Sequence, residues 1–561
     1  MKLRIKNLTG VALIASIFMA TGCSKDFFNR PPESSITAGS YYQTTAQVQA
    51  STNALYAMPW FGFNGKVFLT IGDLQSGNAI NGGGSDPTMD PFFNFSQNNG
   101  SDAVRSAWFA LYTVVAQSNA LLSNLPATVP ASVPTNVVNN ALGEARLIRA
   151  TAYFYLAKNF RDVPIITDPT VLVGSFQTVP VNPVTDVYKF IVNDLRFAEA
   201  NCTPNVASSG HASSGTASGM LAKVYLYLQN YDSARIEAEK VINSGEFSLV
   251  GTGGSALSFV NLFESAGNNS SESMLQEQWG AGANSGYGHG NQIQSVVAPS
   301  NGNGGNPTNL TGFTDGWAEL GVSFDLQNLF KANGDVTRRY GTYMLAGDFY
   351  PEITKADGGL TVPTTISAQN SHAAIKKYVT GTPADNGGIG AMQSSAANTT
   401  LLRFADMYLI AAEAIVGKAA GVQQGKGIPL TTSSSDATAL GYINVIRKRA
   451  GVAPLSGSFT YQQLLDERRM EFAFEGDFWY DLQRIDGFNS STHPVAIGII
   501  KAQNRGGATA GTEANNYLDY TINTFNVSPT DTNFLLPIPA TEAAADPALL
   551  QPPVPYDFSN N

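Results

Sequence analysis

Apolar side chains recur at three- and four-residue spacing along much of the chain, which is the pattern of amphipathic α-helices. Val104–Leu125 is a clear example, because Trp108 and Leu111 fall on one broad apolar face. The pattern predicts four helices in the N-terminal part: Gln47–Ala57, Val104–Leu125, Ala141–Phe160 and Val184–Ala200.

Two helix pairs are predicted farther along the chain. The first lies between Ser218 and Ser244, with Asn230-Tyr231-Asp232 as its turn, and Leu401–Val416 with Ala437–Ala450 forms the second. Small alanines at the contact positions match the tetratricopeptide template, although the repeats share no tandem identity. The pairs are therefore either a degenerate tetratricopeptide-type repeat or generic antiparallel hairpins. Both interpretations predict a mainly α-helical fold.

Three long stretches are rich in Gly, Asn, Ser, Thr and Pro: Trp60–Gly100, Gly251–Leu320 and Gly347–Asn398. We expect irregular loops there, with minor β-structure. Loops of this length inside a folded chain are usually functional or disordered, and these carry aromatic residues that a flexible linker would lack. The sequence thus predicts a helical scaffold that presents long, decorated loops.

The composition supports a large folded core: 43% of the residues are hydrophobic and only 14% are charged, against roughly a quarter in an average soluble chain. A formal charge of −10 provides no basic surface for phosphate backbones, so no nucleic-acid partner is expected. Cys202 and the four dispersed histidines have no metal-ligand spacing. We expect no metal and no cofactor.

The amino terminus has the form of an export signal. A basic head precedes an apolar run, Val11–Ala20, that is far shorter than the roughly 20 residues of a permanent membrane span. Small residues then precede Cys23, which resembles the lipobox of bacterial lipoproteins. We predict a signal peptide at residues 1–22, a lipidated tether at 23–37 that begins with acylated Cys23, and a folded body at 38–561.

Four blocks, in this order, resemble motifs of the SusD/RagB family of outer-membrane nutrient-binding lipoproteins. They are Gly143–Ala150 (GEARLIRA) continuing to Pro164, Leu401–Ala414 (LLRFADMYLIAAEA), Glu467–Leu482 (ERRMEFAFEGDFWYDL) and Leu535–Pro539 (LLPIP) with Asp546-Pro547. Together with the lipobox, the blocks extend the resemblance over nearly the whole mature chain.

The resemblance implies a SusD-like helical scaffold, with an N-terminal part at about 38–230 and a C-terminal RagB/SusD part at about 231–561. It implies a lipid-anchored protein on the cell surface that binds an oligosaccharide without cleaving it. The partner implied is a SusC-like TonB-dependent transporter in the outer membrane. Ligand contacts in this family come from variable loops, so the resemblance does not identify the glycan.

Binding a sugar requires flat apolar rings for stacking and amides or carboxylates for its hydroxyl groups. The long loops provide both, whereas Trp108 and Trp479 lie within periodic patterns and are expected in the core. Each loop ring is otherwise expected to fill the interior of its own loop. The candidate ligand-binding residues are Trp60, Asn81, Phe92, Trp279, Tyr287 and Trp317.

Glu467, Glu471 and Glu475 lie four residues apart on one helical stripe, where a surface glycosidase would place an acid and a nucleophile. We instead expect structural ion pairs, with Arg468 bound to Glu471 or Glu475 within the helix. The same interpretation pairs Glu144 with the arginines Arg146 and Arg149, and Arg403 with Asp406 and Glu413. No catalytic residue is predicted, and a peptide-binding module of the tetratricopeptide type is the other alternative.

Overall fold

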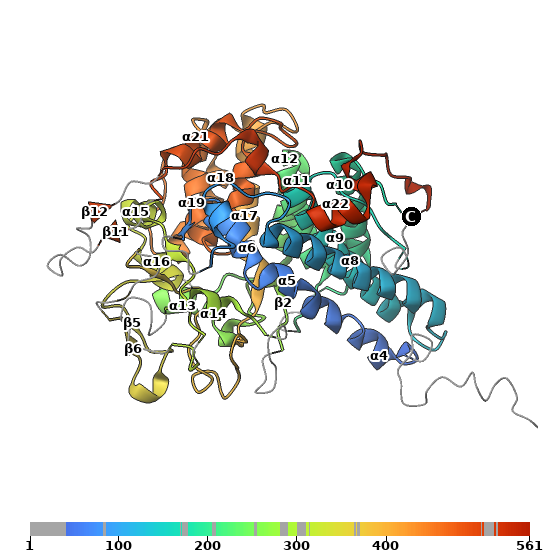
Figure 1. Cartoon of the computed structure of the whole chain (residues 1–561), viewed down its shortest axis with the longest axis horizontal. Coiled ribbons are helices and arrows are strands. Elements are labelled where there is room, and N and C mark those ends of the chain that lie inside the picture. The colour runs from blue at the N-terminus through green and yellow to red at the C-terminus, as the bar shows by residue number, and fades with distance from the viewer. Residues whose placement is uncertain are drawn as a thin grey trace, which may run out of the picture.

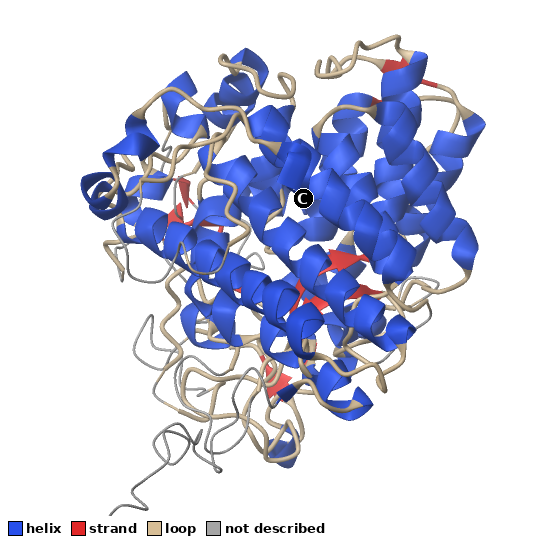
Figure 2. Ribbon diagram, turned by 90° about the vertical axis from the view of Figure 1, so that its right-hand side faces the viewer, coloured by secondary structure: helices blue, strands red, loops and turns tan. Residues whose placement is uncertain are grey.

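The computed structural model describes residues 41–81, 86–168, 170, 178–204, 209–251, 255–280, 290–299, 310–313, 315–363, 366, 371–505, 508–509, 521–522 and 526–560. The predicted signal peptide, Cys23 and the tether lie outside the described residues. Figure 1 shows long helices packed side by side in one half of the molecule, from α8 (Asp102–Thr128) to α12 (Tyr231–Ser244). The other half holds α17 (Phe404–Ala419) and α18 (Ala437–Arg449) together with shorter helices and irregular segments. Strands are few and short (Figure 2), so the expectation of a mainly α fold is confirmed.

The helices vary from one turn to more than seven turns. The α-helices are α4 (Thr45–Ala50), α5 (Phe61–Asn64), α6 (Val67–Leu69), α7 (Asp90–Phe93), α8, α9 (Thr135–Phe160), α10 (Val184–Asn201), α11 (Ser214–Tyr227), α12, α13 (Ala256–Val260), α14 (Ile293–Val297), α15 (Phe324–Ala332), α16 (Val336–Thr342), α17 (Phe404–Ala419), α18 (Ala437–Arg449), α19 (Tyr461–Phe472), α20 (Phe478–Arg484), α21 (Pro494–Ala502) and α22 (Ala540–Ala545). A π-helix, η3, spans Thr70–Leu74.

The strands form small antiparallel sheets. They are β1 (Ala79–Ile80), β2 (Ser273–Glu277), β3 (Gly321–Val322), β4 (Tyr343–Met344), β5 (Phe349–Tyr350), β6 (Leu360–Thr361), β7 (Ala374–Ile375), β8 (Thr399–Arg403), β9 (Ser433–Ser434), β10 (Phe459–Thr460), β11 (Ala508–Thr509) and β12 (Thr521–Ile522). The largest sheet has the order β1-β3-β7-β4, and β2 pairs with β8 in a separate ladder.

The long helices pack in a simple succession. Each of α8 to α12 contacts the next, α12 then packs on α17, and α17 packs on α18. The segment between α12 and α17 holds the short strands and loops, so it is an excursion from an otherwise continuous stack of helix pairs. Asn230 caps α12 by accepting a hydrogen bond from the Ser233 N–H. The predicted turn is therefore confirmed at Asn230, whereas Tyr231 and Asp232 already belong to α12.

Three predictions about secondary structure were wrong. Gln47–Ala57, expected to be one helix, is α-helical only as far as Ala50, and a separate 3-10 helix follows at Asn53–Tyr56. Leu401–Arg403, expected to begin a helix, belongs to β8, because an antiparallel partner more than a hundred residues earlier pairs with it. Trp60–Gly100, expected to be loop, contains α5, α6, η3 and α7 and is largely buried. Its glycines serve close packing as well as turns: a Cβ on Gly72 would lie 2.4 Å from the Cα of Gly476.

Gly476 belongs to one of the sequence blocks that carry the family resemblance. Its φ of +77° lies in the left-handed region that favours glycine. The Asp73 carboxylate accepts hydrogen bonds from the Phe474 and Gly476 backbone N–H groups, at 2.8 and 2.9 Å. Burial raises the pKa of Asp73 to about 6, although these bonds oppose the shift. The Glu475-Gly476 turn therefore fixes η3 against the C-terminal helices.

Candidate functional site

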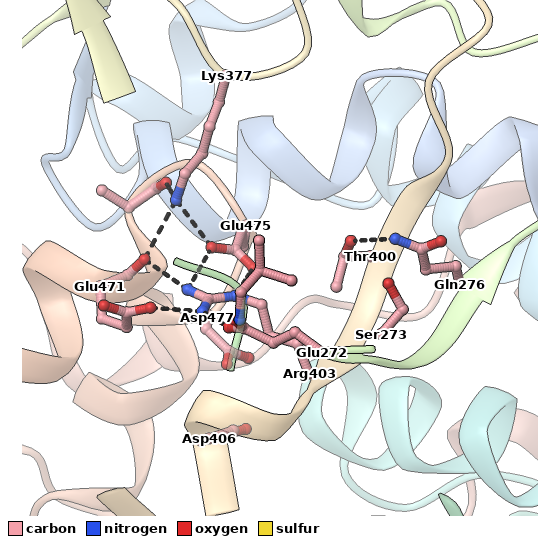
Figure 3. Close-up of polar contacts among 12 residues, drawn as sticks. Glu272, Ser273, Gln276, Lys377, Thr400, Arg403, Asp406, Glu471, Glu475 and Asp477 are labelled. Carbon is pink, nitrogen blue, oxygen red and sulfur yellow. Dashed lines mark hydrogen bonds and ion pairs between the residues drawn. The ribbon is translucent and has the colours of Figure 1, made fainter. Parts of the chain in front are cut away.

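Glu467, Glu471 and Glu475 lie in a buried ion cluster, and Figure 3 shows Glu471 and Glu475 within it. The prediction of one helical stripe was wrong for Glu475, because α19 ends at Phe472. Glu471 is bound by Arg338, Arg403 and Arg449, and none of its side chain is exposed. Burial alone would raise the pKa of Glu471, but the three arginines outweigh it and hold the pKa well below its usual value. A carboxylate held in this way can neither donate a proton at neutral pH nor reach a sugar.

The whole cluster is balanced in charge. Its five carboxylates face five cations among the described residues, and nearly all of these side chains are fully buried. The carboxylates are Asp335, Glu272, Glu467, Glu471 and Glu475, and the cations are Arg338, Arg403, Arg447, Arg449 and Lys377. Buried charges require this pairing, so the cluster is part of the scaffold.

The expectation of structural ion pairs is thus confirmed, but the predicted partners were wrong. Arg468 bonds Asp406 at 2.7 Å and Asp481 at 3.1 Å, from other helices, and does not pair with Glu471 or Glu475. Arg403 pairs with Glu272, Glu471 and Glu475 in place of Asp406 and Glu413. In the earlier block, Arg149 binds Asp194, whereas Glu144 accepts hydrogen bonds from Thr52 and Tyr56 and contacts His211.

Aromatic and amide side chains come together instead where α5, the segment after β2 and the residue before α14 meet, and of these side chains Trp279 and Gln292 are largely buried. We call Phe61, Trp279, Gln292, Gln393 and Trp317 the aromatic rim. The rings of Phe61 and Trp279 lie edge to face, with centroids 6.1 Å apart. The indole Nε1 of Trp279 donates to Thr399 Oγ1 at 2.8 Å, which fixes the plane of the ring. Phe61 is half-buried, and Trp279 keeps 8% of its surface exposed.

The amides of the aromatic rim continue from this pair of rings. Gly65 lets Gln292 approach α5, since a Cβ at Gly65 would lie 3.0 Å from Gln292 Oε1. Gln292 Nε2 donates to Gln393 Oε1 at 3.1 Å, and the Gln393 backbone N–H donates to Asp315. The Trp317 backbone N–H donates to the Ser295 carbonyl at 2.9 Å, which ties the backbone at Trp317 to α14, and the Trp317 side chain is half-buried.

The surface next to the aromatic rim is both apolar and charged. Met392 and Ile389, close to Gln393 in the chain, expose 50% and 48% of their surface. Lys66 bonds Asp86, and Glu319 lies 3.7 Å from the same ammonium group. Burial raises the pKa of Glu319 to about 7, against the opposing effect of Lys66. The aromatic rim thus offers rings, amides and carboxylates within one region.

The structure divides the sequence-predicted ligand residues into three groups. Trp60 and Phe92 are fully buried, so neither ring has a face for a ligand, and we remove both from the candidate set. Asn81 is also buried, and its amide donates to Asp90 at 2.9 Å. Trp279 exposes only 8% of its surface, Trp317 is half-buried, and Tyr287 lies outside the described residues.

Phe61, Gln292 and Gln393 were not among the predicted site residues. Phe61 follows Trp60 directly, and only the orientation of the one-turn helix α5 decides which of the two rings faces outward. Gln393 lies about a hundred residues from Gln292 in the chain, and no spacing in the sequence connects them. Trp108 and Trp479 are buried, as predicted.

A separate groove of about 400 Å³ lies between α8 and α22. Tyr112, Ile166 and Leu549 contribute to its lining, and Phe109 at its edge is 70% exposed. Gln117, Glu542 and Asp546 are polar side chains in its lining. Within the described part of the chain, no group of three or more His, Cys, Asp and Glu side chains could hold a metal ion.

Comparison with known proteins supports the family resemblance. A family model described as "SusD family" matches residues 271–555, and one described as "Starch-binding associating with outer membrane" matches residues 90–226. A SusD-like protein of Bacteroides ovatus is 30% identical, with 99% of this chain and 98% of that protein covered. SusD-like protein P2 of Formosa agariphila is 27% identical over 85% of this chain and 90% of its own length.

The fold also matches solved structures. A crystal structure determined with a xylogluco-oligosaccharide has a TM-score of 0.76 and 28% sequence identity to this chain. The match covers 91% of this chain and 99% of that structure. The architecture described above, including the excursion between α12 and α17, therefore corresponds to a known fold along nearly its whole length.

Proposed function

This chain belongs to the SusD family, and we propose that it is a surface lipoprotein that binds an oligosaccharide and delivers it to a SusC-like TonB-dependent transporter. The aromatic rim is the observation that carries the proposal. The half-buried rings of Phe61 and Trp317 can stack on the C–H face of a sugar, and the amides of Gln292 and Gln393 can hydrogen-bond paired hydroxyl groups. Asp86 and Glu319 add acceptors at one end of this surface.

We propose that the protein binds its ligand without cleaving it. The glutamates that a glycosidase would need are Glu467, Glu471 and Glu475, and all are held by buried arginine or lysine side chains. A retaining or inverting mechanism requires two carboxyl groups on opposite sides of an accessible glycosidic bond. The buried cluster offers no such access.

The outer membrane is the location that we propose, with acylated Cys23 as the anchor. The family model for residues 90–226 describes association with this membrane. None of the helices in the described residues is long and apolar enough to cross a bilayer. Replacing Cys23 with Ser is expected to move the protein from the membrane pellet to the soluble fraction and to abolish labelling with a fatty acid. Retention in the pellet would contradict the anchor.

Isothermal titration tests the binding site, with xyloglucan oligosaccharides and maltooligosaccharides as ligands. For whichever ligand binds, Trp317→Ala is expected to weaken affinity roughly tenfold or more, because a stacked ring is lost from the surface. The melting temperature should stay close to that of the unmodified protein, since Trp317 is only half-buried.

Phe109→Ala is the matched control, because it also removes a surface aromatic ring but from the groove beside α8. It is expected to leave affinity unchanged. Loss of binding in Phe109→Ala with full binding in Trp317→Ala would place the ligand in the groove and refute the site proposed here. Co-purification of the lipidated protein with an outer-membrane barrel from native membranes tests the partner, and isolation as a lone monomer would count against it.

A further inference from the structure

A buried carboxyl group lies behind the aromatic rim. Glu277 is the last residue of β2 and is 1% exposed. Asn64, at the end of α5, donates a side-chain hydrogen bond to Glu277 Oε1. Thr399, which is its partner in the ladder with β8, also forms a side-chain hydrogen bond with it. Within the described residues, no Lys, Arg or His lies within ion-pair distance, and Oε2 has no hydrogen-bond partner.

This environment differs sharply from that of Glu471. Burial without a neighbouring cation raises the pKa of Glu277 well above its usual value, and the bond with Thr399 opposes the shift only in part. Burial therefore disfavours the charged form of this carboxyl group. A neutral carboxyl in a core adds no charge to be compensated, and it acts through its directional hydrogen bonds.

Glu277 is linked to the segments that build the aromatic rim through Asn64 and Thr399. Asn64 is three residues after Phe61 on α5, and Glu277 is two residues before Trp279. Thr399 Oγ1 accepts the Trp279 Nε1–H at 2.8 Å, so its own proton is available for the carboxyl group. Thr399 Oγ1 also lies 3.4 Å from the amide nitrogen of Asn291, the residue before Gln292.

We propose that Glu277 is a positioning residue that holds Phe61 and Trp279 in their mutual arrangement, so that ligand affinity depends on a side chain that the ligand does not touch. The expected effect of Glu277 on ligand affinity rests on the proposed function. Its structural part, the placement of the Trp279 ring through Thr399, stands independently of any ligand.

Two replacements of Glu277 separate hydrogen bonding from volume. Glu277→Gln keeps an acceptor for Asn64 and Thr399 and carries no charge. Glu277→Leu has a similar size but leaves both donors without an acceptor, which is the costly outcome for buried polar groups. The leucine variant is expected to disturb the aromatic rim, and the glutamine variant is expected to restore it.

The readout is ¹⁹F NMR of protein labelled with 5-fluorotryptophan. The five tryptophans are Trp60, Trp108, Trp279, Trp317 and Trp479, and a Trp279→Phe variant assigns the resonance of interest. Glu277→Leu is expected to shift or broaden the Trp279 resonance and to leave those of Trp108 and Trp479 in place. A general loss of structure would move all five. Glu277→Gln is expected to give the spectrum of the unmodified protein.

Affinity for xyloglucan oligosaccharides and maltooligosaccharides, measured by titration, is the second readout. Glu277→Leu is expected to weaken the binding roughly tenfold or more, and Glu277→Gln to stay within about twofold of the unmodified protein. An unchanged Trp279 resonance in Glu277→Leu, or an unchanged affinity, overturns the proposal. If neither ligand binds the unmodified protein, the proposed function fails for these ligands, while the spectrum still decides whether Glu277 places Trp279.

A second variant tests the same proposal if Glu277→Leu does not fold. Thr399→Val removes the hydroxyl group between Trp279 and Glu277 at nearly constant volume. It is expected to displace the Trp279 resonance in the same direction. A Trp279 resonance that stays in place in Thr399→Val would show that the hydrogen-bonded link does not set the position of the ring.

Discussion

Replacing Glu471 with Gln tests whether the buried cluster is scaffold or catalytic machinery. Glu471 contacts Arg338, Arg403 and Arg449, and an amide in its place leaves the balanced cluster with one uncompensated positive charge. At an effective dielectric constant near 20, each of the three contacts contributes about 4 kcal/mol of gross attraction. Two effects offset much of the attraction that is lost. The amide costs less to desolvate than the carboxylate, and the repulsion between Glu471 and the neighbouring carboxylates disappears.

The net cost of breaking a buried ion pair from one side is about 3–5 kcal/mol, and we expect Glu471→Gln to fall in this range. Urea unfolding followed by circular dichroism measures it as a lower midpoint. Asp232→Asn is the matched control, because Asp232 pairs with Lys418 at the surface with side chains 62% and 65% exposed. Its cost should be within about 1 kcal/mol.

Activity assays complete this test. Because Glu471 is inaccessible and locked by three arginines, the unmodified protein is expected to release no reducing ends from xyloglucan or starch. If Glu471→Gln kept full stability and abolished a measurable turnover of polysaccharide, the structural interpretation of the cluster would be refuted. The surface glycosidase would then be the better hypothesis.

Other predictions concern the close contact between η3 and Gly476 and the charged residues Lys66, Asp86 and Glu319 next to the aromatic rim. Gly72→Ala places a methyl group 2.4 Å from Gly476 Cα, so we expect it to cost about 3 kcal/mol or more in urea unfolding. Gly441→Ala, in α18 where an added Cβ meets nothing within 4 Å, should instead stabilise the protein by about 0.5–1 kcal/mol; equal midpoints for the two variants would contradict the packing argument. For Glu319, the folded-state pKa of about 7 lies above the ordinary value of 4.5, so its contribution to stability is complete below about pH 4.5 and is lost as the pH rises through about 7. Glu319→Gln should therefore match the unmodified protein near pH 5 and exceed it in urea midpoint near pH 8, and an equal difference at both values would contradict the assigned shift.

Local sequence patterns predicted the long helices because helix formation depends on neighbours three and four residues apart. Val184–Ala200 was predicted, and α10 spans Val184–Asn201. The turn at Asn230 was identified because a capping side chain acts within three residues. Four sequence blocks were enough to indicate the family, which the comparisons then established.

The partners of the buried charges could not be obtained in this way. Arg403 and Glu471 are 68 residues apart, and Arg338 and Glu471 are 133 apart, so neither pair has a helical spacing. The sequence indicated that these side chains need partners, since buried charges are costly when unpaired. Which carboxylate meets which arginine depends on how α16, β8 and α19 pack.

The candidate site shows the same division between local and tertiary information. Composition identified the segments that carry aromatic rings and amides, including those of Trp279 and Trp317. It did not distinguish Trp60, which is fully buried, from Phe61, which lies on the aromatic rim. A ring is buried or exposed according to the surface that covers it, and here that surface comes from segments far away in the chain. The sequence by itself therefore determined the helical scaffold and the family, whereas only the tertiary structure decided which side chains face a ligand and which hold the core together.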